Sequence, residues 1–221
     1  MPNMPAVGKP ELEQLIINNV PRDALMACED AYYGGDEKGR MHSAIFSLGH
    51  RPSAAGQVKH FHVNEAFHEA LQAHGGEPSP LRGTRLVIGR LGIFNIARLN
   101  VAGHKWVNLN RGATRKKLAE LNQVIEQKYV QGDFFTGDRE VTRGTIFILG
   151  VVDGIDTNGI AQLTQVMVAL PAPDMKSWLY RSTMAEVLKL YDQLNVVGQP
   201  DNAQPKLKKQ PKKKTDDDQG N

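Results

Sequence analysis

The clearest alternation of hydrophobic and polar positions in this chain runs from Thr84 to Val130. Three segments in its first half, TRLVIGRL, IFNIARLNV and KWVNLN, have the pattern of successive strands. The next segment, RGATRKKLAELNQVIEQKYV, has apolar side chains at helical spacing and predicts one long helix over 114–130. We expect this β-meander and its helix to form the structural centre of the protein.

The pattern upstream predicts two helices between Pro10 and Tyr33. Pro21 separates them, because the residue before a proline avoids helical backbone angles. The pair Gly34 and Gly35 is expected to end the second helix, since glycine is favoured just past a helix C-terminus.

Strand patterns return between residues 41 and 63, in MHSAIFSL and in VKHFHV. A Gly- and Pro-containing segment between them predicts a loop. Asn64 then has the position of a helix N-cap in front of EAFHEALQAH, and the glycines at 75 and 76 are expected to close that short helix.

The C-terminal half predicts a hairpin and a last helix. TIFILGVV and IAQLTQVMVAL have strand patterns, and the dipeptide Asn158-Gly159 between them is a strong hairpin signal. The last helix is expected to run from Trp178 to about Leu194. A second reading is that Thr183 and Glu186 form a capping box and start this helix later.

These elements together predict an α+β protein, with an antiparallel sheet of about five to seven strands packed on about five helices. The predicted organisation is a flexible N-terminus at 1–9, a single domain at 10–196, and a disordered tail rich in Lys and Asp at 197–221.

The charge of the chain is unevenly distributed. The whole sequence has 27 Lys and Arg against 24 Asp and Glu, and the segment from Lys206 to the end contains six lysines and three aspartates. The rest of the chain is therefore neutral overall. Bulk charge gives no support for a domain that grips duplex nucleic acid over a whole face.

A single cysteine, Cys28, excludes an intramolecular disulfide and a cysteine-based zinc site. It falls on the apolar face of a predicted helix, so we interpret it as a core residue. The N-terminal sequence has no apolar run of signal-peptide length, and the apolar runs elsewhere have strand length. We expect a cytoplasmic protein without membrane insertion.

Six of the seven histidines fall between residues 42 and 74. On a strand, His60 and His62 would point the same way and could chelate a metal together with His68 from the next helix. A histidine pair at this spacing is a weak signal, and ordinary surface and helix-end roles explain each residue as well. We therefore predict no metal and no cofactor, and keep His60, His62 and His68 as weak candidates.

Cations gather at the predicted start of the 114–130 helix, where free backbone N–H groups attract anions. The same cations oppose the helix dipole, so their placement runs against local helix preference. The residues expected to bind an anion or an acidic partner surface are Lys105, Trp106, Arg111, Arg115, Lys116 and Lys117. The alternative is a solvated charged face with Lys116 paired to Glu120.

No motif in the sequence is specific to one activity. The first functional hypothesis is a non-catalytic regulatory protein, an accessory or inhibitory factor of the kind that mobile elements and phages encode, which binds a protein partner through its basic surface. A second is a metal hydrolase, or a phosphodiesterase or nuclease with His104 as general base and Arg111 and Arg115 on the phosphate. A third is nucleic-acid binding through the basic helix start and the tail.

Overall fold

The computed structural model describes residues 9–103, 112–131 and 140–194. They form six helices and one five-stranded sheet, which places the protein in the α+β class, as expected. The elements are α1 (Lys9–Asn19), α2 (Arg22–Ser43), α3 (Arg51–Ala73), β1 (Ile88–Leu91), β2 (Phe94–Ala102), α4 (Ala113–Glu120), α5 (Gln123–Tyr129), β3 (Gly144–Ile155), β4 (Ala161–Pro171), β5 (Trp178–Thr183) and α6 (Met184–Leu194).

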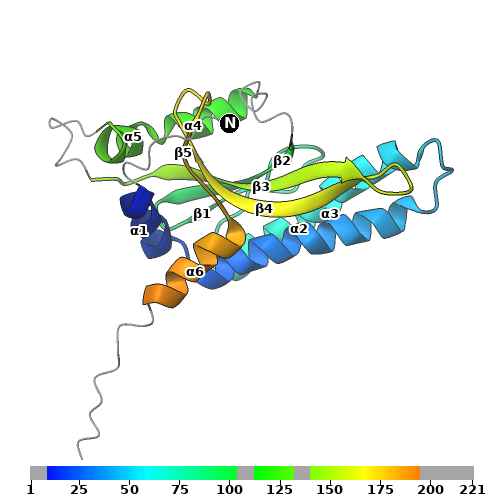
Figure 1. The fold of residues 1–221 in the computed structure, drawn as a ribbon, viewed down its shortest axis with the longest axis horizontal. Coiled ribbons are helices and arrows are strands. Elements are labelled where there is room, and N and C mark those ends of the chain that lie inside the picture. The colour runs from blue at the N-terminus through cyan, green and yellow to red at the C-terminus, as the bar shows by residue number, and fades with distance from the viewer. Residues whose placement is uncertain (1–8, 104–111, 132–139, 195–221) are drawn as a thin grey trace, which may run out of the picture.

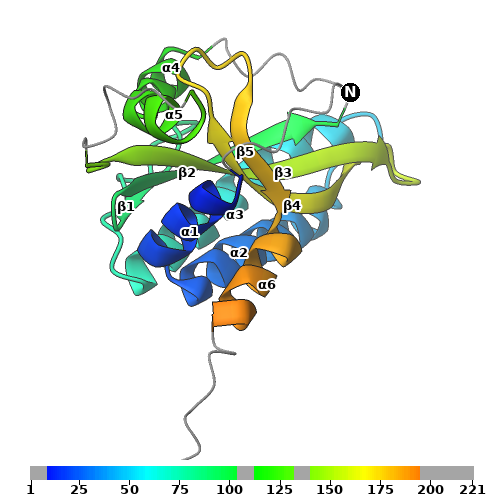
Figure 2. The same ribbon diagram turned by 60° about the vertical axis from the view of Figure 1, so that its left-hand side comes forward.

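The sheet lies between two helical layers (Figures 1 and 2). Helices α1, α2, α3 and α6 cover one face, and α4 and α5 lie on the other. Side chains alternate between the two faces of the strands, so each face has its own hydrophobic core. Ile96 and Ile148 belong to the core beneath α2 and α3, whereas Leu99 and Phe147 pack with Leu118 of α4.

The strand order is β1-β2-β3-β4-β5, and one pair differs from the expected antiparallel sheet. β2 and β3 are parallel, from Phe94 opposite Gly144 to Ala102 opposite Val152. Parallel neighbours require a crossover connection, and here it carries α4 and α5 over one face of the sheet. The predicted third meander strand, KWVNLN, lies outside the described residues.

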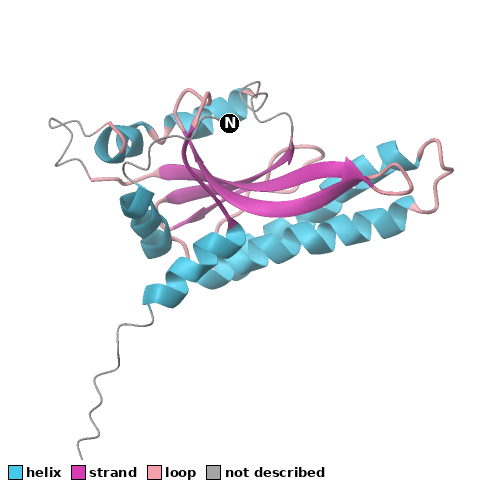
Figure 3. Cartoon of the chain, in the orientation of Figure 1, coloured by secondary structure: helices cyan, strands magenta, loops and turns pink. Residues whose placement is uncertain are grey.

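The predicted strands MHSAIFSL and VKHFHV are wrong, because α2 and α3 form a long helical hairpin through this region (Figure 3). Gly34 and Gly35 do not end α2, which continues to Ser43. A Cβ on Gly35 would come within 2.7 Å of the Val63 Cα, and one on Gly39 within 2.6 Å of the Lys59 Cα. These two glycines allow the helix backbones to approach closely.

The predicted 114–130 helix is interrupted, because Asn122 turns its fully buried side chain onto the backbone. Its Nδ2 donates to the carbonyls of Thr145 at 3.0 Å and Pro171 at 2.8 Å, and its Oδ1 accepts from the Thr145 N–H at 2.7 Å. These bonds tie the junction between α4 and α5 to two strands, so α4 and α5 are separate helices.

The later start of the last helix is confirmed, and the start at Trp178 is wrong. Residues 178–183 form strand β5, and α6 begins at Met184. The Thr183 hydroxyl accepts from the Glu186 N–H at 3.2 Å, while the Glu186 carboxylate accepts from the Thr183 N–H at 2.9 Å. This reciprocal pair is a capping box.

Two other predictions are confirmed. The β3–β4 hairpin is present, with Gly159 in its turn at φ +73°. Cys28 is buried, and burial raises the pKa of its thiol to about 12. In the described part of the chain, no helix is long and apolar enough to cross a membrane. The tail from 197 onward lies outside the described residues.

Candidate anion-binding cleft

Arg98 is the least expected residue of the sheet. It lies in the middle of β2, on the face shared by Phe94 and Ile96, which turn into the core under α2 and α3. Its side chain is only 1% exposed. Charged side chains are almost never buried to this extent without a partner, so its surroundings decide what it does.

Uncharged groups hold the Arg98 guanidinium. Its Nε donates to Asn64 Oδ1 at 2.7 Å, and one terminal nitrogen donates to Asn100 Oδ1 at 3.4 Å. The other terminal nitrogen donates to the ring Nδ1 and to the backbone carbonyl of His60, both at 2.9 Å. Hydrogen bonds therefore satisfy the guanidinium, but none of these partners supplies a negative charge.

The hydroxyl of Tyr32, on α2, lies beside this cation. Burial raises the pKa of Tyr32 to about 12, and the positive charge of Arg98 and a hydrogen bond from it oppose the rise. The neutral hydroxyl lies 2.9 Å from the carbonyl oxygen of Leu99 and 2.8 Å from that of Ile148, one on each parallel strand. Tyr32 therefore does not act as a counter-ion for Arg98.

His60 is kept neutral by the same arrangement. Partial burial lowers its pKa, and the neighbouring charge of Arg98 lowers it further. The guanidinium can only donate, so Nδ1 accepts from it at 2.9 Å and Nε2 carries the single proton of the neutral ring; the Asn64 amide nitrogen 3.2 Å from Nε2 is then a contact between two donors and not a hydrogen bond. Burial also lowers the pKa of Arg98, but the ordinary pKa of a guanidinium is so far above neutral that the group stays protonated near neutral pH.

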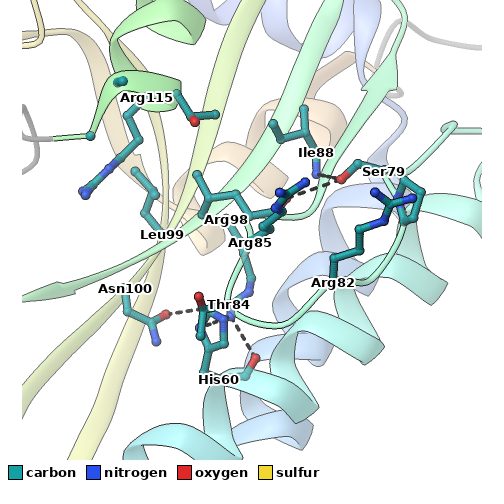
Figure 4. Close-up of a pocket in the computed structure, with 15 residues that line it drawn as sticks. His60, Ser79, Arg82, Thr84, Arg85, Ile88, Arg98, Leu99, Asn100 and Arg115 are labelled. Carbon is teal, nitrogen blue, oxygen red and sulfur yellow. Dashed lines mark hydrogen bonds between the residues drawn. The ribbon is translucent and has the colours of Figure 1, made fainter.

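A cleft of about 900 Å³ opens above this network (Figure 4). It lies along β2 where that strand continues past β1, because β1 pairs with β2 only from Phe94 to Ala97. The lining residues come from α3, the loop before β1, both strands and the start of α4. They are His60, Ser79, Pro80, Arg82, Thr84, Arg85, Leu86, Ile88, Arg98, Leu99, Asn100, Gly112, Ala113, Thr114 and Arg115.

Ser79 closes the loop that carries Arg82 and Arg85. Its backbone N–H donates to the carbonyl of Ile88 at 2.8 Å, and its hydroxyl accepts from the Ile88 N–H at 3.1 Å. Asn64 ties the same loop to α3 by donating to the Arg85 carbonyl at 3.3 Å. These bonds fix the backbone from which the two arginines extend.

The charged side chains that line the cleft are all positive. Its lining includes four arginines (82, 85, 98 and 115) and no aspartate or glutamate. Among the residues that the structure describes, none of the four pairs with a carboxylate. An anion in this space would be attracted by all four positive charges, and the less buried Arg82, Arg85 and Arg115 can bind carboxylate or phosphate oxygens in bidentate geometry.

The start of α4 adds to this positive charge. Gly112 is the N-cap, with extended backbone at φ −96° and no side-chain capping bond. The first N–H groups of a helix have no partner within the helix, and the helix dipole places partial positive charge there. Gly112, Ala113 and Thr114 all line the cleft, so this helix terminus faces the same space as the arginines.

Of the predicted binding residues that the structure describes, Arg115 alone lines the cleft. Lys116 and Lys117 are exposed on α4 and are not among the lining residues. The remaining residues of that set, together with the proposed general base, lie outside the described residues: His104, Lys105, Trp106 and Arg111.

The metal candidates do not converge in space. Because α3 is helical, His60 and His62 point about 200° apart around its axis instead of the same way. The His62 ring lies 2.8 Å from His42 and 3.2 Å from the Glu65 carboxylate, away from the His60 contact with Arg98. No group of three or more His, Cys, Asp or Glu side chains in the described residues could hold a metal ion, and this includes His68.

Arg82, Arg85 and Arg98 were not predicted as site residues from the sequence. A signal for Arg98 was present: in IFNIARLNV it alternates with Phe94 and Ile96, so a charge falls on a core-facing position. Arg82 and Arg85 lie in a loop between turn residues and carry no comparable signal. Their place in the cleft depends on how the loop folds against β1.

Comparison of the chain with protein-family models, with curated proteins and with solved structures gave no match.

Proposed function

We propose that this chain is a non-catalytic binding protein and that it holds an anionic group in the arginine cleft. The observation that carries the proposal is the buried Arg98, whose described partners are all uncharged. Burying a cation without a counter-charge costs free energy that its hydrogen bonds only partly offset. A bound anion would provide the missing charge.

Phosphate is the best-matched anion. Arginine presents N–H groups in a planar fork that suits phosphate and carboxylate oxygens, and helix N-termini bind phosphate through backbone N–H groups. The anionic group belongs either to a macromolecular partner or to a ligand that regulates the protein. An accessory or inhibitory role remains part of this proposal.

Hydrolysis of a phosphodiester is the weaker candidate. His60 lines the cleft and is neutral, as a general base must be. Its Nδ1 lone pair, however, accepts from Arg98 at 2.9 Å, and its Nε2 carries the proton. Neither nitrogen is therefore ready to remove a proton from a nucleophile, and His60 is better understood as a positioning residue for Arg98.

The test is a calorimetric titration with pyrophosphate of the wild type and of Asn64→Asp. In this variant a carboxylate replaces the amide oxygen that lies 2.7 Å from Arg98 Nε, so the protein supplies its own counter-charge. We expect pyrophosphate affinity to fall by about tenfold, or ~1.4 kcal/mol, with all four arginines still present.

The matched control is Asn18→Asp, which adds the same charge at an exposed position of α1. Its affinity should stay within about twofold of the wild type, because exposed distant charges are screened by salt. Arg115→Gln provides a second loss variant at a partly exposed position that is not expected to affect folding. Equal affinity of the two aspartate variants, or no binding by the wild type, would refute the proposal.

A further inference from the structure

A second, smaller hollow of about 190 Å³ adjoins the arginine cleft. It is lined by Phe61, Asn64, Glu65, Leu81, Arg82 and Gly83. Unlike the cleft, it combines two exposed apolar side chains with a carboxylate.

Three observations show that the small hollow adjoins the arginine cleft. Arg82 lines both of them. Asn64, in the wall of the small hollow, bonds Arg98 in the floor of the cleft at 2.7 Å. The ring of Phe61 lies edge-on to that of His60, with centroids 5.8 Å apart, and His60 lines the cleft. One ligand can therefore reach from the arginines into the small hollow.

The chemistry of the small hollow fits a planar heterocycle. Phe61 is 42% exposed and Leu81 is 46% exposed, so both lining side chains present apolar surface to solvent. Aromatic side chains stack on nucleobases whatever the base, and an arginine beside the ring can add a cation–π contact. Glu65 is exposed and accepts hydrogen bonds, as the amino edge of a base requires.

We propose that the combined site takes a nucleoside phosphate, with its phosphate among the arginines of the cleft and its base against Phe61 and Leu81. This inference rests on the anion-binding function proposed above and adds the base subsite to it. The same chemistry occurs in a free nucleotide and in the terminal nucleotide of a nucleic-acid strand.

The first experiment compares ligands that share one phosphate and differ in the base. Ribose 5-phosphate, AMP and GMP are titrated into the full chain by calorimetry. At least one nucleotide should bind about tenfold more tightly than ribose 5-phosphate, because stacking on Phe61 is available only to a base.

Phe61→Ala is the variant that isolates the base subsite. It should remove the advantage of the nucleotide and leave ribose 5-phosphate affinity unchanged. Phe46→Ala is the matched control, since Phe46 is also 42% exposed but lies in the connection between α2 and α3, outside both hollows. It should change neither affinity.

The outcomes separate the two proposals. If ribose 5-phosphate binds and the nucleotides bind no better, the base subsite is wrong and the anion cleft stands. If pyrophosphate and all three phosphates fail to bind, both proposals fail. Tighter binding of a phosphoserine peptide than of any nucleotide would also overturn the nucleoside assignment.

A final pair of titrations identifies the source of the nucleotide. A short single strand with a 5′-phosphate is compared with the matching mononucleotide. A strand that binds more tightly, with a steeper loss of affinity as salt increases, supports a nucleic-acid end as the ligand. Equal affinity supports a free nucleotide.

Discussion

The guanidinium of Arg98 is an internal cation whose described partners are all neutral. His60, Asn64 and Asn100 accept its hydrogen bonds, and Tyr32 lies beside it as an uncharged phenol. Hydrogen bonds orient the group but do not cancel its field, which is weakly screened away from water. The protein thus maintains a fixed positive potential at the floor of the cleft.

The pKa of His60 makes the stability of the fold depend on pH. Its pKa in the folded protein is below the ordinary 6.5, through burial and then the charge of Arg98, so the unfolded chain takes up the proton first as pH falls. The contribution of His60 to the free energy of unfolding is therefore constant above pH 6.5 and decreases as the pH falls below 6.5. The slope for one proton is at most about 1.4 kcal/mol per pH unit.

We therefore expect His60→Gln to flatten the decline in stability below pH 6.5. Urea unfolding at a series of pH values from neutral to mildly acidic measures this difference between wild type and variant. His50→Gln is the control, because His50 is exposed in the connection between α2 and α3. Parallel pH profiles for the wild type and His60→Gln would show that the Arg98 potential does not act on this ring.

Helix α3 shows what local pattern can and cannot predict. Its segment contains Gly56 and the strand-like VKHFHV, and these signals favoured a loop and a strand. Long-range packing overrides them, since Val63, Phe67 and Leu71 fall at helical spacing and are buried against the sheet and α2. One capping signal was correct, since the Thr183–Glu186 box located the start of α6. The glycines at 34 and 35 and the predicted N-cap Asn64 lie inside helices instead.

The parallel pairing of β2 and β3 could not be read from the sequence. Both strands were predicted, but the order in which strands pair depends on contacts between residues far apart in the chain. Arg98 was detectable as a charge on a core-facing strand position. Its partners were not, because His60 was placed on a predicted strand and Asn64 at the start of a shorter predicted helix, whereas both lie on α3.

Close packing of α2 on α3 gives a paired prediction for two adjacent glycines. In Gly35→Ala the new Cβ would lie 2.7 Å from the backbone of Val63, so we expect a loss of about 1–3 kcal/mol. In Gly34→Ala nothing lies within 4 Å, and the better helix former should add about 0.5–1 kcal/mol. Denaturant unfolding measures both, and equal effects would mean that the helices do not pack this closely.

The positive character of the whole protein is concentrated in two places. One is the arginine cleft, and the other is the sequence from Lys206 onward, with six lysines. Without that segment the chain is neutral overall, so carboxylates elsewhere in the sequence balance the four cleft arginines. Binding of any anion should weaken with added salt, so salt dependence alone does not distinguish the two regions.

Ending the chain at Pro205 distinguishes them. If the cleft holds the anion, the shortened protein should bind pyrophosphate within about twofold of the full chain at 0.15 M salt, since it keeps every residue that lines the cleft. The measurement is calorimetry on both chains at two salt concentrations. Loss of binding on truncation would assign the anion to the tail instead.

The uncompensated charge of Arg98 also bears on how an unknown ligand can be found. A ligand that binds the folded chain and not the unfolded one increases the free energy of unfolding and so raises the melting temperature. The stabilisation is about 2.7 kcal/mol when the ligand concentration is 100 times its dissociation constant. A thermal scan over a panel of anionic metabolites needs no assay of activity. In such a scan, a ligand that raises the melting temperature of the wild type but not that of Asn64→Asp is one whose binding depends on the positive charge of Arg98.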